Sequence, residues 1–353
     1  MNALITGGAG FIGSHLAEEL IRRGDSVYAI DNLSTGNFNN IQHLLENERF
    51  TFIQGSILDR YQTERFVRES DIIYHLAAAV GVKYIMENPL TSIQCNIHGT
   101  ELILELASKW RRKVLISSTS EVYGKNENVP YKEDGDFLMG ATTTTRWSYA
   151  CAKALDEFMA LAYFKEQDVP VIIVRFFNIC GPRQTGQYGM VVPRFVRNAI
   201  LGKPLEVYGD GTQSRCFAYV GDAIRAVLRL TETEKAVGEI FNVGNTQEIR
   251  IRDLAQKVIE LTNSSSKIEY IPYENVYGDS FEDMKRRVPD ISKIRDLIGW
   301  QAEVDLDELL RIVIEYEMAV LGLMDVPSEK LSKSSTTVFP IARTSEVIQY
   351  PTK

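Results

Sequence analysis

The chain of 353 residues is poor in the residues that build disulfide frameworks and metal sites, with four cysteines and four histidines. The cysteines lie far apart without a CxxC pair, and the histidines are equally scattered. Free thiols in a reducing compartment are therefore expected, and neither disulfides nor a metal site. The residues concerned are Cys95, Cys151, Cys180, Cys216, His15, His43, His75 and His98.

The sequence also lacks a basic excess and a long apolar run. The formal net charge is −8, whereas nucleic-acid binders usually carry a basic stripe, so no nucleic-acid partner is expected. No apolar run approaches the roughly 20 residues that span a bilayer, which argues against a membrane partner. The first residues enter a strand and a glycine turn and do not resemble a signal peptide. We expect a cytoplasmic protein.

Short apolar runs that alternate with helical patterns are the main feature of the first half of the chain. Strands that are followed by helices in this rhythm indicate βαβ units and a parallel sheet. The expected fold class is therefore α/β, with a Rossmann-type doubly wound parallel sheet. The strands are expected at residues 2–6, 26–30, 49–54, 71–78, 113–119 and 170–176, and the helices at 11–23, about 86–109 and about 148–166.

The texture of the sequence changes at about residue 178, where glycine and proline become frequent and the strands become shorter. We expect a Rossmann domain over residues 1–177 that regains pieces at about 216–245. Residues 178–325 should form mainly a smaller, mixed α/β lobe, and a helix at 250–262 should belong partly to each of the two parts. Residues 326–353 are rich in Ser, Thr and Lys with weak periodicity, and we expect a flexible tail there.

A glycine-rich loop follows the first expected strand. Gly7, Gly10 and Gly13 form a GxxGxxG pattern that opens a helix, where free N–H groups and the helix dipole favour a pyrophosphate. Asp31 ends the second strand, where a carboxylate accepts hydrogen bonds from the ribose hydroxyls of an adenosine. The same carboxylate would repel a 2′-phosphate, and no arginine follows it closely. The sequence therefore predicts NAD, rather than NADP, as the cofactor.

A tyrosine and a lysine four residues apart form the candidate for proton transfer. Tyr149 and Lys153 lie on one face of an expected helix, and a nearby ammonium group should lower the pKa of the tyrosine. Such a tyrosine can accept a proton from a substrate hydroxyl while hydride leaves the same carbon. The hydroxyl residues 117–120 end the fifth expected strand, at the edge of the sheet where ligands bind.

These motifs together resemble the extended short-chain dehydrogenase/reductase family, and within it the nucleotide-sugar epimerases, decarboxylases and dehydratases. The resemblance covers roughly residues 2–320. It implies NAD as cofactor, a nucleotide-sugar substrate, and a homodimer formed through the helices at about 86–109 and 148–166. The segments that carry it are TGGAGFIGSHL (6–16), HLAA (75–78), STSEVYG (118–124), YACAK (149–153) and RFFNICGPR (175–183).

The resemblance also implies roles for single residues. Thr119, Tyr149 and Lys153 match the catalytic group, and Glu121 is a further catalytic candidate. The expected cofactor-binding residues are Gly7, Gly10, Phe11, Ile12, Gly13, Asp31, Asn32, Ser56, Ile57, Leu76, Ala77, Ala78, Tyr149 and Lys153. The expected substrate-binding residues are Thr119, Ser120, Arg146, Asn178, Arg183, Thr185, Val191, Arg215 and Arg287. Ser56 departs from the family pattern, because relatives often carry an aspartate there, near the adenine.

The resemblance leaves the reaction open. All members begin by oxidising C4 of the sugar, and a dehydratase is disfavoured because Ser120 replaces the aspartate that precedes Glu121 in the dehydratases. The segments TRWSY (145–149) and GPRQTGQYGMVVPRF (181–195) favour a 4-epimerase that acts on a UDP-hexose or UDP-hexuronate, with UDP-glucuronate preferred. Arg146, Arg183 or Thr185 would then restrain the sugar carboxylate in the plane of the ring.

Two alternatives to the epimerase stay open. A UDP-glucuronate decarboxylase, which yields UDP-xylose or its 4-keto precursor, is indicated by Glu121 and Arg287, since the decarboxylases carry both residues. For an epimerase, the better interpretation of Glu121 is a carboxylate that hydrogen-bonds loop amides and moves no proton. A non-catalytic NAD-binding regulatory protein is disfavoured by the presence of Thr119, Tyr149, Lys153 and Asn178.

Overall fold

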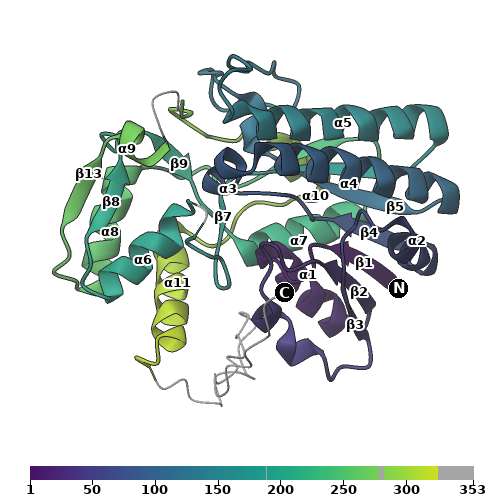
Figure 1. Ribbon diagram of the computed structural model, residues 1–353, viewed down its shortest axis with the longest axis horizontal. Helices are drawn as coiled ribbons and strands as arrows, with labels where there is room; N and C mark the ends of the chain where they lie inside the picture. Colours follow the sequence, from purple (N-terminus) through teal and green to yellow (C-terminus); the bar gives the residue numbers. More distant parts are fainter. Residues whose placement is uncertain (188, 278–281, 325–353) are drawn as a thin grey trace.

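A seven-stranded parallel sheet forms the centre of the protein (Figure 1). The computed structural model describes residues 1–187, 189–277 and 282–324. The strands lie in the order β11-β6-β5-β4-β1-β2-β3, so the strand order reverses between β1 and β4. This arrangement confirms the expected doubly wound α/β fold. The strands are β1 (Asn2–Thr6), β2 (Ser26–Asp31), β3 (Phe50–Gln54), β4 (Ile72–His75), β5 (Lys113–Thr119), β6 (Val171–Phe176) and β11 (Ile240–Val243).

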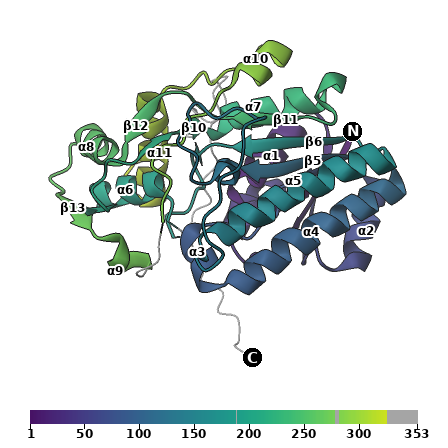
Figure 2. The same cartoon turned by 90° about the horizontal axis from the view of Figure 1, so that it is seen from above.

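Helices cover both faces of the sheet (Figure 2). Successive strand residues point to opposite faces, and in β1 Ala3 and Ile5 join one buried cluster while Leu4 joins another. The first cluster includes α1 and α7 and continues into the lobe, and the second includes α2, α4 and α5. These helices are α1 (Phe11–Arg22), α2 (Arg60–Glu69), α4 (Pro89–Trp110), α5 (Trp147–Gln167) and α7 (Val220–Thr231).

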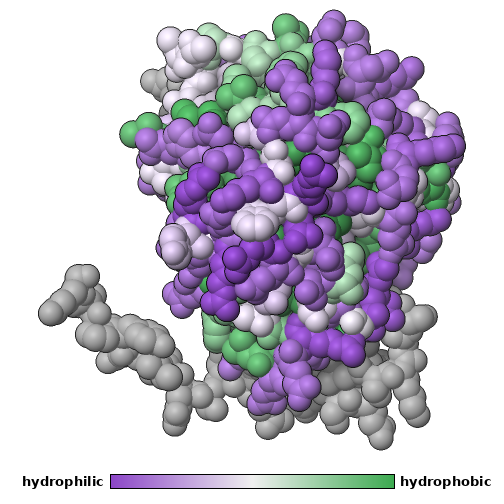
Figure 3. All heavy atoms as spheres, turned by 90° about the vertical axis from the view of Figure 1, so that its right-hand side faces the viewer, coloured by the Kyte–Doolittle hydropathy of each residue, from purple (hydrophilic) through white to green (hydrophobic). Residues whose placement is uncertain are grey.

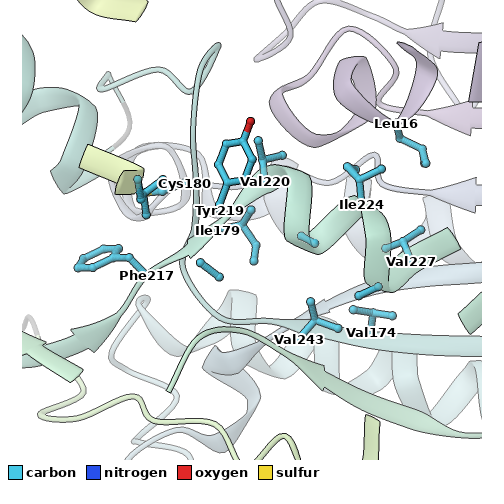
Figure 4. Close-up of a cluster of buried hydrophobic side chains, with 14 of the residues drawn as sticks. Leu16, Val174, Ile179, Cys180, Phe217, Tyr219, Val220, Ile224, Val227 and Val243 are labelled. Carbon is cyan, nitrogen blue, oxygen red and sulfur yellow. The ribbon is translucent and has the colours of Figure 1, made fainter. Parts of the chain in front are cut away.

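One continuous core joins the sheet to the remaining part of the chain. In Figure 4, Val174 of β6 and Val243 of β11 lie beside Ile224 and Val227 of α7, with Leu16 of α1 above them. The same cluster extends to β7 (Ile179–Cys180) and to β10 (Ala218–Tyr219), which pair in parallel. The segments that follow β6 are therefore packed directly against the sheet.

The smaller lobe combines short strands with helices, at the left of Figure 1. The strand β8 (Leu205–Tyr208) pairs in parallel with β13 (Ile268–Ile271), and β9 (Ser214–Cys216) pairs antiparallel with β12 (Glu248–Arg250). Its helices are α6 (Val191–Ile200), α8 (Ile251–Thr262), α9 (Tyr273–Tyr277) and α11 (Leu306–Val320), while α10 (Ser292–Ile298) lies against β11. The tail expected at 326–353 lies outside the described residues.

The helix expected at about 86–109 corresponds to α4 (Pro89–Trp110), and a separate short helix precedes it. The short helix α3 (Val82–Glu87) ends before Asn88, and α4 begins at Pro89. Proline lacks an N–H group and restricts the preceding residue, so it starts a helix more readily than it continues one. Four short 3₁₀ segments complete the described elements: η1 (Phe38–Asn40), η2 (Gln42–Leu44), η3 (Ser120–Tyr123) and η4 (Glu234–Ala236).

The surface in Figure 3 is mainly hydrophilic, and hydrophobic residues occur there in small groups. Within the described ranges, no helix has both the length and the apolar character that crossing a membrane requires. All four cysteines are free thiols.

Candidate active site

A cavity of about 620 Å³ opens at the carboxyl ends of the central strands, between the sheet and the smaller lobe. Most of the residues expected from the sequence to bind cofactor or substrate line this one cavity. The exceptions are Lys153 and Arg146, which are buried beside it. The lining residues are Gly7, Gly10, Phe11, Ile12, Gly13, Asp31, Asn32, Ser56, Ile57, Leu76, Ala77, Ala78, Thr119, Ser120, Glu121, Tyr149, Asn178, Arg183, Thr185, Val191, Arg215 and Arg287.

The glycine loop between β1 and α1 has the close approach that a pyrophosphate site needs. Gly7 has φ +74°, and a Cβ atom there would lie 2.9 Å from the backbone nitrogen of Ala77, in the loop that follows β4. A Cβ atom on Gly13 would overlap the carbonyl oxygen of Gly7. The missing side chains leave the backbone N–H groups at the start of α1 open toward the cavity. This loop therefore fits a dinucleotide.

Asp31 lies at the end of β2, in the wall of the same cavity. Its Oδ2 atom accepts a hydrogen bond from the Ala9 N–H at 3.0 Å, and its Oδ1 atom accepts one from Leu33 at 2.8 Å. Burial raises the pKa of this carboxyl group and the backbone hydrogen bonds oppose that rise. The fixed carboxylate is a suitable acceptor for ribose hydroxyls.

The substitution Gly13→Ala tests this loop. Because the new methyl group overlaps backbone, we expect a loss of about 1–3 kcal/mol of stability and weaker retention of NAD. Thermal unfolding and the NAD content of the purified protein provide the two measurements. Gly299→Ala is the control, since φ is +63° there but nothing lies within 4 Å of the added atom. The control should lose stability and keep its NAD; equal NAD retention in both variants would contradict the assignment of the loop.

Tyr149 and Thr119 face the cavity together. Thr119 is the last residue of β5, Tyr149 lies in the first turn of α5, and their side chains are hydrogen-bonded. Burial raises the pKa of Tyr149, and the charges of Glu121 and Asp156 add to the rise, while Thr119 and Arg287 oppose it. The expectation of a lowered tyrosine pKa is therefore wrong for the protein without ligands.

Burial is the main physical reason for the raised pKa of Tyr149. Lys153, one turn further along α5, is engaged by another acid. Its ammonium group donates a hydrogen bond of 2.8 Å to Asp156 Oδ2, and both side chains are almost completely buried. Lys153 is thus engaged by a carboxylate on its own helix. The YxxxK pattern drew attention to Lys153, but it does not include the aspartate three residues further along.

Glu121 is held by two arginines, and the interpretation that it hydrogen-bonds loop amides is wrong. Arg146 forms a two-pronged ion pair with its carboxylate, and Arg287 Nη2 lies 3.1 Å from its Oε1 atom. Burial disfavours the charged form, but the fields of Arg146 and Arg287 prevail and lower the pKa to about 2. Arg146 itself is buried behind Glu121, so it supports the acid and does not line the cavity.

A second carboxylate, Asp283, completes this charged group and was missed by sequence reasoning. Arg215 Nη2 binds both of its oxygens at 3.0 and 2.9 Å, and the Tyr273 hydroxyl donates to Oδ2 at 3.2 Å. Asp283 stands four residues before Arg287, a spacing that could have drawn attention to it. Together with Glu121 and Arg146, these residues form a cluster of three arginines and two carboxylates beside the cavity.

Asn178 and Arg183 follow β6 on the other wall of the cavity. Asn178 has φ +43° and donates a hydrogen bond to the Cys216 carbonyl at 2.9 Å. Arg183 Nη2 binds Glu18 of α1 at 2.6 Å, which places its guanidinium group next to the helix that the glycine loop begins. Thr185 and Val191 also line the cavity, close to and within the first turn of α6.

A buried ion pair that was not expected from the sequence fixes β6 to α5. Arg175 of β6 binds Glu157 of α5 through Nε at 2.9 Å and Nη2 at 2.7 Å. The Ser118 hydroxyl, next to Thr119, donates to the same carboxylate. Glu157 therefore fixes the strand that carries Thr119 relative to the helix that carries Tyr149.

Comparisons with known proteins identify the family of the chain. The protein family described as GDP-mannose 4,6 dehydratase matches residues 4–313. A UDP-N-acetyl-alpha-D-glucosaminuronate decarboxylase from Bacillus cytotoxicus is 46% identical over 314 residues, which are 89% of this chain and 96% of that protein. UDP-glucuronic acid decarboxylase 1 from Arabidopsis thaliana is 37% identical over 325 residues, which are 91% and 71% of the two chains.

Solved structures of epimerases have the same fold. A UDP-glucuronic acid 4-epimerase from Bacillus cereus, in complex with UDP-glucuronic acid and NAD, has a TM-score of 0.82 and 30% identity and covers 91% of this chain and 100% of its own. A UDP-glucose 4-epimerase from Thermotoga maritima, with UDP-glucose, has a TM-score of 0.82, 31% identity and the same coverage. The two related sequences named here are thus decarboxylases, and the two solved structures named here are epimerases.

Proposed function

Because the chain belongs to the nucleotide-sugar enzymes of the extended short-chain dehydrogenase/reductase family, we propose that it is an NAD-dependent decarboxylase of a UDP-hexuronate. The single observation that carries this proposal is the pair Glu121–Arg287, which faces the cavity beside Tyr149. Removal of a carboxylate needs a cation that places it and an environment that favours its loss as neutral CO₂. The pair supplies both.

The cofactor is NAD, and the residues present suit it. The glycine loop would hold the pyrophosphate, Asp31 the adenosine ribose, and Ser56 and Ile57 lie in the cavity wall beyond β3, where the adenine is expected. Bound NAD supplies a hydride acceptor that returns the hydride later in the same turnover. NAD is then not consumed.

The first step of the proposed reaction uses Tyr149 and Thr119. Tyr149 accepts the proton of the C4 hydroxyl as hydride leaves C4, and Thr119 hydrogen-bonds the same oxygen. The product of this step is a 4-keto sugar acid, whose carboxylate is β to the ketone. Tyr149 now carries the proton and can donate a hydrogen bond to the developing negative charge on O4.

The second step uses the charged cluster. Arg287 binds the C6 carboxylate, while the negative charge of Glu121 disfavours that carboxylate relative to neutral CO₂. The C5–C6 bond breaks, CO₂ leaves, and the electron pair forms an enolate across C4 and C5. Proton uptake from water at C5, return of hydride to C4 and return of the Tyr149 proton to O4 give a UDP-pentose sugar. Without the final return of hydride, the 4-keto product would be released.

A 4-epimerase of a UDP-hexuronate, which the sequence favoured, is now the second candidate and is supported by the solved structure from Bacillus cereus. It would share the first step and return hydride to the other face of C4. The proposed restraint of the carboxylate by Arg146 has less support, because Arg146 is buried and does not line the cavity. Arg183 does line it and also pairs with Glu18. The relatives with decarboxylase names shift our preference from the epimerase to the decarboxylase.

Incubation with two substrates tests the proposal. UDP-glucuronate and UDP-N-acetylglucosaminuronate are each mixed with the purified protein, and the products are followed by mass spectrometry and proton NMR. Loss of the mass of CO₂ is the expected result, and the substrate that reacts identifies the group at C2. A product of unchanged mass with inverted C4 would establish the epimerase instead.

The proposal includes a homodimer in a reducing, cytoplasmic setting, the latter supported by the four free thiols. An apolar stripe on α5 supports the dimer, since Leu155 and Phe158 are 43% and 65% exposed and lie one turn apart. Leu90 of the neighbouring helix α4 is 66% exposed. Such surface is more typical of an interface than of a free helix.

Phe158→Asp should convert the protein to a monomer, because a carboxylate would be buried in an apolar interface. Light scattering coupled to gel filtration gives the mass directly. Tyr61→Asp is the matched control, since Tyr61 is 94% exposed on α2, away from the stripe. A parent protein that is already monomeric, or a Phe158 variant that stays dimeric, would exclude this interface.

A further inference from the structure

Asp156 is a buried acid beside the catalytic residues to which the reaction proposed above gives no role. Its side chain is fully buried, and its Oδ2 atom binds the Lys153 ammonium at 2.8 Å. Its Oδ1 atom has no hydrogen-bond partner within the described residues, although the Thr100 hydroxyl lies close enough to help lower the pKa of the group. Buried ion pairs are costly to desolvate, so stability alone is a weak explanation for this one.

A chain of polar side chains leads from this acid toward the nucleotide loop. His75 Nε2 lies 3.2 Å from Thr100 Oγ1, and His75 Nδ1 lies 2.8 Å from Thr6 Oγ1. The Ala77 N–H donates to the same Thr6 Oγ1 atom at 3.2 Å, so these side chains connect to the loop that lines the nucleotide cavity. Burial and the charge of Lys153 lower the pKa of His75 to about 3, so the ring is neutral. The cation that Asp156 contacts is Lys153.

Tyr149 lies one turn before Lys153 on the same helix. Asp156 and the Tyr149 phenolate can therefore both interact with the Lys153 ammonium group. Asp156 binds it in the structure, and the Tyr149 phenolate needs it during proton transfer. The charged and titratable groups that face this region are Glu121 from η3, Arg287 from the lobe, Cys95 from α4, His75 from β4 and Glu157 from α5.

We propose that Asp156 is a positioning residue that competes with the Tyr149 phenolate for the Lys153 ammonium. The inference rests on the proton-transfer role proposed above for Tyr149. A cycle that removes a proton and later returns it requires a group that is neither too strong nor too weak a base. Sharing one ammonium between two acids achieves this, because Asp156 limits how far Lys153 stabilises the phenolate.

The test is the ionisation of Tyr149 in the full-length protein, measured without a sugar substrate. The phenolate absorbance of each variant is titrated against pH, and the same variant with Tyr149→Phe is subtracted. Asp156→Asn should lower the pKa of Tyr149 by about 1 unit, since the ammonium loses its other anionic partner. Asp156→Glu, which keeps the charge, should titrate like the parent.

The route of the effect is tested in a Lys153→Gln background. If Asp156 acts mainly through the lysine, the shift caused by Asp156→Asn should be much smaller once the ammonium is absent, because only the direct effect of its charge on Tyr149 then remains. A shift of undiminished size there would mean that the carboxylate acts on the tyrosine directly and not through Lys153, and the proposal would be wrong. An unchanged pKa in Asp156→Asn itself would overturn it equally.

Two further variants test for a general effect of charge on this helix and for a failure of Asp156→Asn to fold. Glu166→Gln removes an exposed carboxylate from the end of the same helix and should leave the titration unchanged. Asp156→Ser, which also removes the charge, should shift the pKa of Tyr149 in the same direction, and it gives a result even if Asp156→Asn does not fold. Because the titration uses no substrate, its result does not depend on whether the protein decarboxylates a UDP-hexuronate.

Discussion

Tyr149→Phe is expected to lower kcat by about 10²–10⁴-fold, the usual contribution of a general base. The variant removes one oxygen from the first turn of α5, which is hydrogen-bonded to Thr119 at the cavity wall. Without this oxygen, the proton of the C4 hydroxyl has no acceptor as hydride leaves C4. Both the oxidation and the later return of hydride should slow, so neither NADH nor a 4-keto sugar should accumulate.

The measurement is single-turnover reduction of bound NAD by UDP-glucuronate or UDP-N-acetylglucosaminuronate, followed by the absorbance of NADH. Tyr163→Phe on the same helix is the matched control, because Tyr163 is partly buried, packs in the cluster with α2 and α4 and does not line the cavity. The control should react like the parent. A Tyr149 variant that reduces NAD at the parent rate would assign the base to another residue.

The position of the site was largely predictable from the sequence, because parallel βαβ units bring the ends of all their strands to one edge. The glycine loop, Asp31 and Tyr149 follow different strands, yet they meet at one cavity as expected. The signals were local in each case: glycines at a turn, an acid at a strand end, and a helical spacing between Tyr149 and Lys153.

The partners of these residues were not predictable, since they depend on contacts between distant segments. Glu121 and Arg287 are 166 residues apart in sequence and 3.1 Å apart in the structure. Arg146 and Arg183 were expected to face the sugar; Arg183 lines the cavity, whereas Arg146 is buried against Glu121 and does not. The fold therefore decides where each paired arginine lies, and a single sequence carries no record of it.

Glu121→Gln is expected to separate the two halves of the proposed reaction. Oxidation at C4 needs Tyr149 and Thr119, which the substitution leaves in place, so bound NAD should still be reduced. Loss of CO₂ should slow by about 10²-fold, the usual effect of removing one charged group that acts on a transition state. NADH and the 4-keto sugar acid should therefore accumulate, and mass spectrometry of the quenched reaction would detect the latter.

The same variant has a second signature that does not depend on turnover. The pKa of Glu121 lies at about 2 in the folded protein, against an ordinary value of 4.5, so the folded state binds fewer protons than the unfolded one between these values. The stabilisation from this group is present above about pH 4.5 and is lost as the pH falls toward 2. Glu121→Gln should be less stable than the parent at neutral pH, and it should lose less further stability on acidification.

Glu248→Gln provides the comparison for both measurements. Glu248 binds Arg286, the neighbour of Arg287, through two hydrogen bonds of 2.8 and 2.7 Å, but neither Glu248 nor Arg286 lines the cavity. It therefore removes an arginine partner of the same kind without touching the site, and CO₂ release should continue. Full decarboxylation by the Glu121 variant would return this carboxylate to a purely structural role and would assign the loss of CO₂ to other residues.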